Sequence, residues 1–233
     1  MFILWDLFQN TREKQKLIRR EAKAAKKRGE KVRSKIVRFL IVCEGSETEP
    51  NYFESFIADN YSQVLSPIVR GGGRSTCSLV KWAKEKKDEL ERASQLRFDR
   101  VWVVFDKDDN NDFDKAIELA RKYGFQVAWS NEAFELWFLL HFQYCDTAIS
   151  RTAYIEKLES KIRECKGYKT YRYEKNSKKM YDIITSLGNE KSAISYARHL
   201  RSTYSKEQKF SEHNPCTTVD RLIEELRCPE KFL

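Results

Sequence analysis

Three carboxylates of the sequence stand directly after two apolar segments that have the composition of buried β-strands. Glu44 follows the run 36–43, and Asp106 and Asp108 follow the run 100–105. Nearly continuous apolar runs are typical of parallel strands buried on both faces, and ligands of parallel sheets bind outside the carboxyl ends of the strands. We therefore expect the three carboxylates at one edge of a sheet, where such oxygen atoms bind hard divalent cations, Mg²⁺ or Mn²⁺.

The spacing within this set supports a shared cation. Asp106 and Asp108 are two residues apart, which places both side chains on one side of an extended chain while Lys107 faces away. Taken singly, each carboxylate is most simply a solvated charge at a strand end, but together they repel one another unless a cation or protonation compensates. Glu44, Asp106 and Asp108 are thus the predicted catalytic and metal-binding residues. Gly45 permits a sharp turn with room for a phosphate or ion, and it and Lys107 are candidate phosphate contacts.

Two further segments are weaker candidates for the same site. Glu135 is the sole carboxylate of an apolar helix predicted at 133–142, and a buried ion must be paired or metal-bound. We expect it to be a metal ligand, with pairing to a local basic residue as the alternative. The glycines 71–73 and Arg74 precede another helix and could contact a phosphate there, although a plain flexible turn is the simpler explanation. No Walker lysine follows them at the required spacing, so nucleotide hydrolysis is not expected.

The elements that position these residues alternate along the chain. Strand-like runs at 67–70 and 125–129 join the two described above, with helical patterns between them, which predicts an α/β domain at 36–145 with a Rossmann-like parallel sheet flanked by helices. Residues 146–233 show helical patterns and no strong strand, so we expect a helical C-terminal extension. Residues 1–35 form a separate basic N-terminal arm or helix.

The positive charge of the chain is concentrated in this arm. Residues 1–38 contain 13 Lys or Arg against four Asp or Glu, and the remainder is formally neutral, so the net +9 resides at the N-terminus. A segment rich in Lys, Arg and Ala suits a solvated helix or a disordered arm. It can neutralise nucleic-acid phosphates without reading base sequence, with Lys26, Lys27 and Arg28 as candidate contacts. A solubilising tail or a docking helix for a protein partner explains it equally well.

The sequence also carries signals of cellular location. No apolar run approaches the roughly 20 residues of a membrane helix, and the N-terminus lacks the pattern of a signal peptide. The six cysteines are widely spaced, without the C-x-x-C pair of many zinc or redox sites. We expect a cytoplasmic protein with reduced thiols and no membrane contact.

Four blocks of the sequence, taken together and in order, resemble the RloB family. They are 41–53 (IVCEGxxTEPxYF), 104–108 (VFDxD), 130–142 (SNxxFELWxxxHF) and 214–219 (NPxTTV). The resemblance spans about residues 37–226, and the ordered set is far more specific than any one block.

The resemblance implies a Toprim-like catalytic core, as also found in topoisomerases, bacterial primases and overcoming-lysogenization-defect nucleases, and a setting in bacterial antiphage defence. In Toprim nucleases the glutamate matched by Glu44 is a metal ligand or general acid/base, and the aspartate pair matched by Asp106 and Asp108 holds magnesium. Many Toprim sites have a further acid shortly after the pair. Here Asp109 or Glu135 would have to take its place.

These observations lead to three functional hypotheses. The first is a Mg²⁺-dependent endonuclease acting on DNA or RNA, in which metal ions neutralise the scissile phosphate and orient water. The second is a catalytically silent module that binds or senses nucleic acid for a partner enzyme. The third, compatible with the first, is a toxin-like effector of abortive infection restrained by a partner ATPase. Assembly as a homo-oligomer is compatible with all three.

Overall fold

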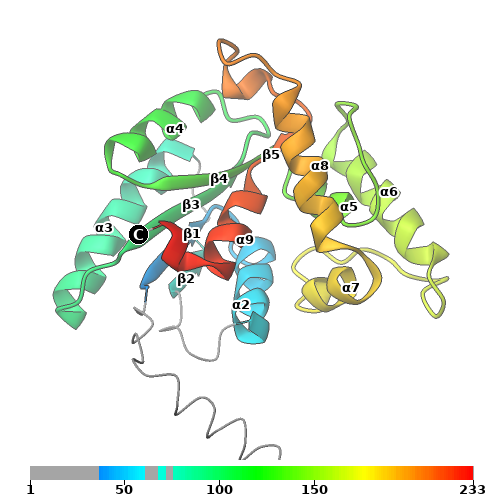
Figure 1. Cartoon of the computed structure of the whole chain (residues 1–233), viewed down its shortest axis with the longest axis horizontal. Coiled ribbons are helices and arrows are strands. Elements are labelled where there is room, and N and C mark those ends of the chain that lie inside the picture. The colour runs from blue at the N-terminus through cyan, green and yellow to red at the C-terminus, as the bar shows by residue number, and fades with distance from the viewer. Residues whose placement is uncertain (1–36, 61–67, 72–75, 233) are drawn as a thin grey trace, which may run out of the picture. The chain divides into compact units, whose positions relative to one another are not determined.

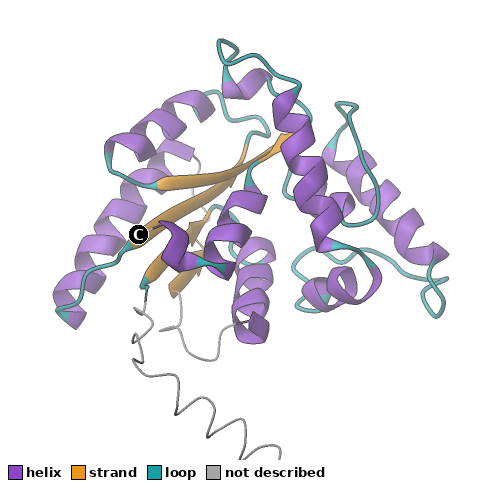
Figure 2. Ribbon diagram, in the orientation of Figure 1, coloured by secondary structure: helices purple, strands orange, loops and turns teal. Residues whose placement is uncertain are grey.

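The apolar runs of the sequence form the central sheet of an α/β unit (Figure 1). The structure, a computed structural model, describes residues 37–60, 68–71 and 76–232. Figure 2 shows the strands side by side with helices around them. The strands are β1 (Phe39–Cys43), β2 (Ile68–Gly71), β3 (Arg100–Asp106), β4 (Gln126–Asn131) and β5 (Cys216–Thr217).

The strand order of the sheet is β2-β1-β3-β4-β5. The first four strands in the chain run parallel, with Cys43 opposite Val104, whereas β5 runs antiparallel to β4 with Thr217 opposite Ser130. From β1 the chain adds β2 on one side and β3 and β4 on the other. The point where the order reverses lies between β1 and β3, and open α/β sheets bind ligands at such a switch point.

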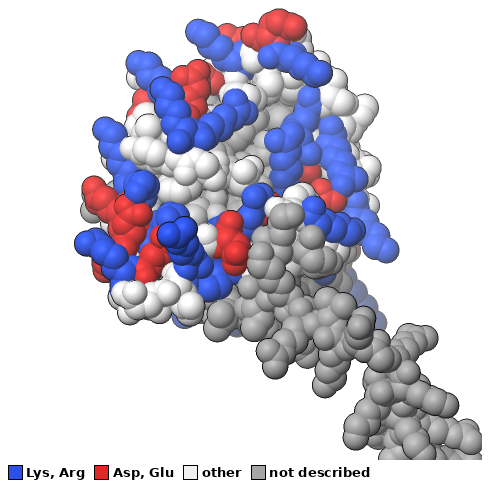
Figure 3. Space-filling model, turned by 60° about the vertical axis from the view of Figure 1, so that its left-hand side comes forward, with Lys and Arg blue, Asp and Glu red and all other residues white. Residues whose placement is uncertain are grey.

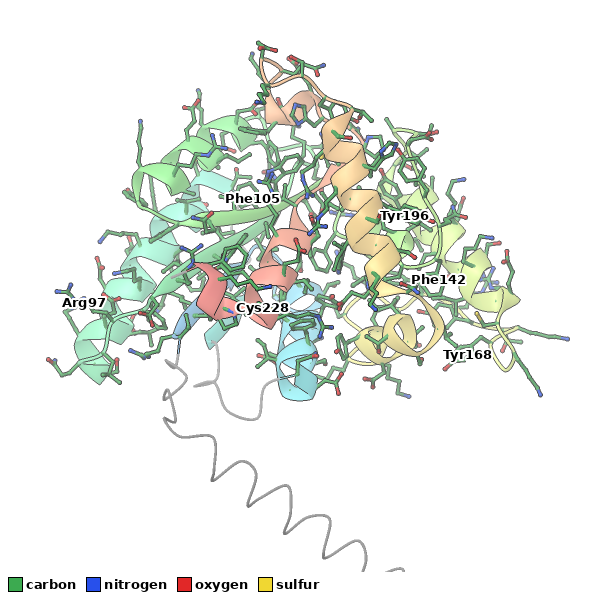
Figure 4. The ribbon with its side chains drawn as sticks, in the orientation of Figure 1. Arg97, Phe105, Phe142, Tyr168, Tyr196 and Cys228 are labelled. Atoms are coloured by element: carbon green, nitrogen blue, oxygen red, sulfur yellow. The ribbon has the colours of Figure 1, made fainter. Side chains whose placement is uncertain are left out.

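Helices cover both faces of the sheet, which confirms the predicted α/β class. Alternate strand residues enter two separate cores, Ile41 and Val104 on one face and Val42, Val103 and Phe105 on the other. The helices of the first face are α2 (Thr48–Asn60), α5 (Glu135–Leu140) and α9 (Val219–Arg227), and those of the second are α3 (Thr76–Ser94) and α4 (Phe113–Lys122). The side chain of Phe105 lies inside the molecule and packs edge-on against Phe113 at the start of α4 (Figure 4).

The C-terminal part is mostly helical, as predicted, but it also returns to the sheet. Its helices are α6 (Arg151–Glu164), α7 (Met180–Leu187) and α8 (Glu190–Ser202), followed by short 3₁₀ helices η1 (Phe210–Glu212) and η2 (Pro229–Phe232). The two-residue β5 was not predicted, because a strand this short has no periodicity to detect. It is held by polar pairing: the backbone N of Thr218 donates to the Trp129 carbonyl, and the backbone N of Trp129 donates to the Thr218 hydroxyl, both at 2.8 Å.

Several predicted features lie outside the described residues. They are the basic arm with Lys26, Lys27 and Arg28, and the part of the glycine turn that follows Gly71, with Arg74. Within the described residues, none of the helices combines the length and the apolar character required to cross a membrane. All six cysteines are described, and all are free thiols.

Candidate active site

The predicted carboxylates line a pocket of about 390 Å³ at the carboxyl ends of β1 and β3. Residues of the loop after β1, of α2, of the turn after β3, of α5 and of α6 contribute to its walls. Its ionisable residues are five acids, Glu44, Glu49, Asp106, Asp108 and Glu135, and two bases, Arg151 and Lys175.

Glu44 is fixed at the edge of the sheet by the backbone of β3. Its own backbone N donates to the Val104 carbonyl at 2.8 Å, which extends the pairing of β1 with β3 by one residue. Its carboxylate accepts from the backbone N of Asp106 at 3.1 Å and from the Asn110 amide at 3.4 Å. Burial raises the pKa of Glu44 above its ordinary value, and the like charge of Asp108 adds to the rise.

Asp106 is more deeply buried than Glu44 and Asp108. It ends β3, and its Oδ2 accepts from the backbone N of Phe134 at 3.1 Å and from Nη2 of Arg151 at 3.0 Å. Burial raises the pKa of Asp106 well above its ordinary value, with further increments from the charges of Glu49 and Glu135. The carboxylate therefore sits in a field that favours either a proton or a cation.

Asp108 and Asp106 both face the guanidinium of Arg151, but their backbone geometry differs from the one predicted. The strand ends at Asp106, and Asp108 lies in a turn with a φ of 34°, so the two aspartates are not successive same-side residues of one strand. Oδ2 of Asp108 is nevertheless 3.4 Å from Nη1 of Arg151. Lys107 folds back so that its Nζ donates to the Asp108 carbonyl at 3.0 Å, and it does not line the pocket.

Arg151 is the residue at the centre of the site that the sequence did not reveal. It is the first residue of α6, whose N-cap is Ser150, and its guanidinium lies 3.0 Å from Asp106, 3.4 Å from Asp108 and 3.6 Å from Glu135. Burial alone would lower the pKa of Arg151, but these three acids raise it above its ordinary value. Arg151 lies outside all four family-like blocks, so no local pattern pointed to it.

Glu135 is buried as predicted, with 3% of its surface exposed, and both of its oxygens have partners within the protein. Oε1 accepts a hydrogen bond from the Tyr173 hydroxyl at 3.0 Å, and Oε2 is 3.6 Å from Nε of Arg151. This is the pairing with a basic residue that the sequence left open as the alternative to metal ligation. Burial and the charge of Glu135 raise the pKa of Tyr173, which keeps that hydroxyl protonated as a donor.

Glu49 is a second site residue that the sequence did not reveal as one. It lies in the first turn of α2 and is 7% exposed, and burial followed by the charges of Glu135 and Glu44 raises its pKa to about 7. Its carboxylate lies directly against Gly45, where a Cβ would collide with it. Gly45 therefore makes room for the Glu49 side chain; it also lines the pocket, and its contact with a phosphate or ion stays a prediction.

The donor set of the pocket fits a hard divalent cation. All five acids offer oxygen ligands, they outnumber the two resident bases, and the pKa values of Glu44, Glu49 and Asp106 are all raised. Among the described residues, however, no three His, Cys, Asp or Glu side chains are already arranged around one metal position. The guanidinium of Arg151 lies among the carboxylates instead.

The model of one protein family, described as RloB-like protein, matches residues 39–226. The chain belongs to the RloB-like family. The match covers the sheet, all of the pocket residues and the C-terminal helices of this RloB-like chain. Comparisons with curated proteins and with solved structures give no match.

Proposed function

We propose that this RloB-like chain is a metal-dependent endonuclease of the Toprim type that hydrolyses phosphodiester bonds in DNA or RNA. The observation that carries the proposal is the convergence of five carboxylates at the switch point of a parallel sheet, three of them with raised pKa values. Carboxylates held together against their own repulsion are typical of sites that bind a cation.

Glu44, Asp106 and Asp108 are the residues that would hold the metal. When bound, Mg²⁺ or Mn²⁺ supplies charge neutralisation of the scissile phosphate and activation of water. The backbone bonds to Glu44 and Asp106 fix these two carboxylates on the sheet, so they need little reorganisation to act as ligands. Asp108, with a side chain 43% exposed, lies at the open side of the pocket.

Arg151 and Glu49 are proposed to act on the substrate rather than on the metal. The guanidinium of Arg151 has a forked donor geometry that suits phosphate oxygens, and a cation that takes over its carboxylate partners would free it for that role. Glu49, with a pKa of about 7, is suited to hold or release a proton near neutral pH.

One observation favours a second candidate, a catalytically silent nucleic-acid-binding or sensing module. The ion pairs of Arg151 with Asp106, Asp108 and Glu135 compensate part of the negative charge without any metal. In that case the carboxylates and Arg151 would form a structural network. A role in antiphage defence and control by a partner ATPase are parts of the proposal that rest on family resemblance alone.

The test is cleavage of supercoiled plasmid DNA, bulk RNA and transfer RNA by the full chain in Mg²⁺, Mn²⁺ or EDTA. The nuclease proposal predicts cleavage of at least one substrate, dependent on the divalent ion and absent in Glu44→Ala. Cleavage by Glu44→Ala at the wild-type rate would show a contaminating nuclease or a wrong site. Binding without cleavage in any of these conditions would favour the silent module.

A further inference from the structure

A second pocket, of about 320 Å³, lies beside β4 and shares no residue with the acidic pocket. We call it the basic pocket. Figure 3, which brings the α3 and α4 side of the molecule forward, shows Lys and Arg side chains, with some Asp and Glu among them, around an uncharged surface in the upper part of the view. The pocket is lined by residues of α4, β4, the end of α8 with the loop after it, η1 and α9.

Four basic side chains and no acid line this pocket: Arg121, Arg201, Lys206 and Arg221. Arg201 is neutralised by Asp220, which it contacts with two parallel bonds at 2.5 and 2.6 Å. Within the described part of the chain, the other three have no ion-pair partner. Partial burial lowers the pKa of Arg221, and the neighbouring charges of Arg201 and Arg121 lower it further, against the opposing charge of Asp220. The pocket therefore holds mutually repelling positive charge that an anion would relieve.

Aromatic side chains form much of the remaining wall. Tyr204 and His213 stack with ring centroids 4.5 Å apart and planes at 10°, and Arg121 lies over the ring of Phe210 at 4.9 Å. His213 is 8% exposed, and within the described residues its Nε2 is buried without a hydrogen-bond partner. Burial lowers the pKa of His213, which favours the neutral ring.

We propose that the basic pocket binds a nucleotide, whose phosphates contact Arg121, Lys206 and Arg221 and whose base lies against the aromatic wall. Arginines suit phosphate oxygens, aromatic side chains suit the planar base, and the volume fits a ligand of this size. The source is either a free nucleotide or one unit of a single strand. The inference goes beyond the proposed nuclease function, since the basic pocket has no residue in common with the acidic one.

The experiment measures binding of ATP, AMP, pyrophosphate and short single-stranded DNA and RNA to the full chain by calorimetry in EDTA, which excludes metal-dependent binding and cleavage. The test variant is Arg121→Ala/Arg221→Ala, in which both side chains are exposed and their removal spares the core. Arg97→Ala is the matched control, because Arg97 is an exposed arginine after α3 that does not line the basic pocket (Figure 4). Thermal unfolding verifies that each variant is folded.

The proposal predicts that at least one nucleotide ligand binds more tightly than pyrophosphate. Its affinity should fall by about tenfold or more in the double variant, as expected for loss of charge-assisted hydrogen bonds. Arg97→Ala and Glu44→Gln should bind as wild type. Preference for ATP or AMP indicates a free nucleotide, and preference for an oligonucleotide indicates a strand.

Two results would overturn the inference: a double variant that binds every ligand as Arg97→Ala does, or pyrophosphate binding as tightly as any nucleotide. If Glu44→Gln loses nuclease activity but binds nucleotide as wild type does, the nuclease site and the nucleotide site are separate. Because the full chain keeps its basic N-terminal segment, strand binding is read only as the difference between wild type and variant.

Discussion

The acidic pocket lies at the carboxyl ends of β1 and β3 and the basic pocket lies beside β4, and the two carry opposite charge. Five acids against two bases line the first, and four bases without an acid line the second. Both arise from a part of the sequence that is formally neutral, since the net +9 of the chain resides in residues 1–38. Net charge therefore says little about the ligands of this domain. The fold separates charges that cancel in the composition.

The two pockets also differ in how their charge is compensated. The guanidinium of Arg151 lies among the carboxylates of the acidic pocket and compensates part of their charge in the absence of a bound metal ion. In the basic pocket only Arg201 has such a partner within the described residues, namely Asp220. We therefore expect metal binding at the acidic pocket to involve competition with Arg151, whereas an anion entering the basic pocket meets no internal competitor.

The largest effect is expected from Asp106→Asn. This change removes a buried carboxylate that ends β3 in the acidic pocket, while its amide keeps the shape of the side chain. Cleavage should fall by more than about 100-fold. Removing even a hydrogen-bond partner of a metal ligand costs up to about 100-fold, and Asp106 is itself a proposed ligand. Nucleotide binding at the basic pocket should not change. Equal cleavage by variant and wild type, measured with Mg²⁺ under single-turnover conditions, would remove Asp106 from the mechanism.

Glu49→Gln should produce the next largest effect, which is an increase in the free energy of unfolding of the metal-free protein. The folded protein holds the Glu49 proton up to a pKa of about 7 and the unfolded chain only to about 4.5, so stability falls as the pH rises between these values. The variant lacks this loss and should be more stable than wild type by about 3 kcal/mol at pH 8 in EDTA, with no difference near pH 4.

The measurement for Glu49→Gln is urea unfolding of both proteins across this pH range. Burial lowers the pKa of His141 to about 4, which changes stability in the opposite direction over a similar range. That contribution is common to both proteins and cancels in the comparison. A variant that is less stable than wild type at pH 8 would show that the Glu49 carboxylate is stabilised by a partner.

A smaller effect is expected from Arg151→Gln, which removes the internal cation. Metal-free stability at pH 7 should fall by about 2 kcal/mol, less than for a fully buried pair because the Arg151 side chain is 34% exposed. Mn²⁺ should bind more tightly than to wild type. Lys175→Gln is the matched control, since it removes one positive charge from an exposed residue of the same pocket. Weaker Mn²⁺ binding in Arg151→Gln than in this control would contradict the competition.

The smallest effect on either pocket is expected from deletion of residues 1–34, which lie outside the described residues. Binding of Mn²⁺ and of nucleotides should be unchanged. Affinity for duplex DNA should depend less steeply on salt. If the arm covers about five phosphates, the slope of log affinity against log salt concentration should be shallower by about 4 to 5. Base preference should stay the same. An unchanged salt slope would assign the arm to a protein partner.

The fold was predictable because its elements carry strong local signals. The runs that form β1 and β3 are apolar throughout, and capping and turn residues mark the helices between them. The two-residue β5 was not predictable, since its place depends on pairing with the distant β4. The contacts of Ser130 and Asn131 show the same limit, since both partners are distant in the sequence: Ser130 contacts Thr217, and Asn131 donates to the Ser211 carbonyl.

Part of the acidic site was predictable because two of its residues directly adjoin the strands. Glu44 and Asp106 adjoin their strands in the sequence, so the strand signal locates them. Glu49 looks like an ordinary acid in the first turn of a helix, and only the fold shows that it points back over Gly45. Arg151 reaches the site from a helix 45 residues after Asp106, and nothing in its own segment indicates that. The residues of the basic pocket also come from segments that are far apart in the sequence, and no local pattern points to them.

The central claim is that the acidic pocket binds a divalent cation, and counting bound Mn²⁺ by electron paramagnetic resonance tests it most directly. The full chain is titrated with Mn²⁺, and the signal of the free ion reports the bound fraction. Wild type should bind at least one Mn²⁺ per chain, and Asp106→Asn and Glu44→Gln should each bind it about tenfold more weakly or worse. Wild-type binding no tighter than that of Asp106→Asn would contradict the account, whatever nuclease activity the preparation shows.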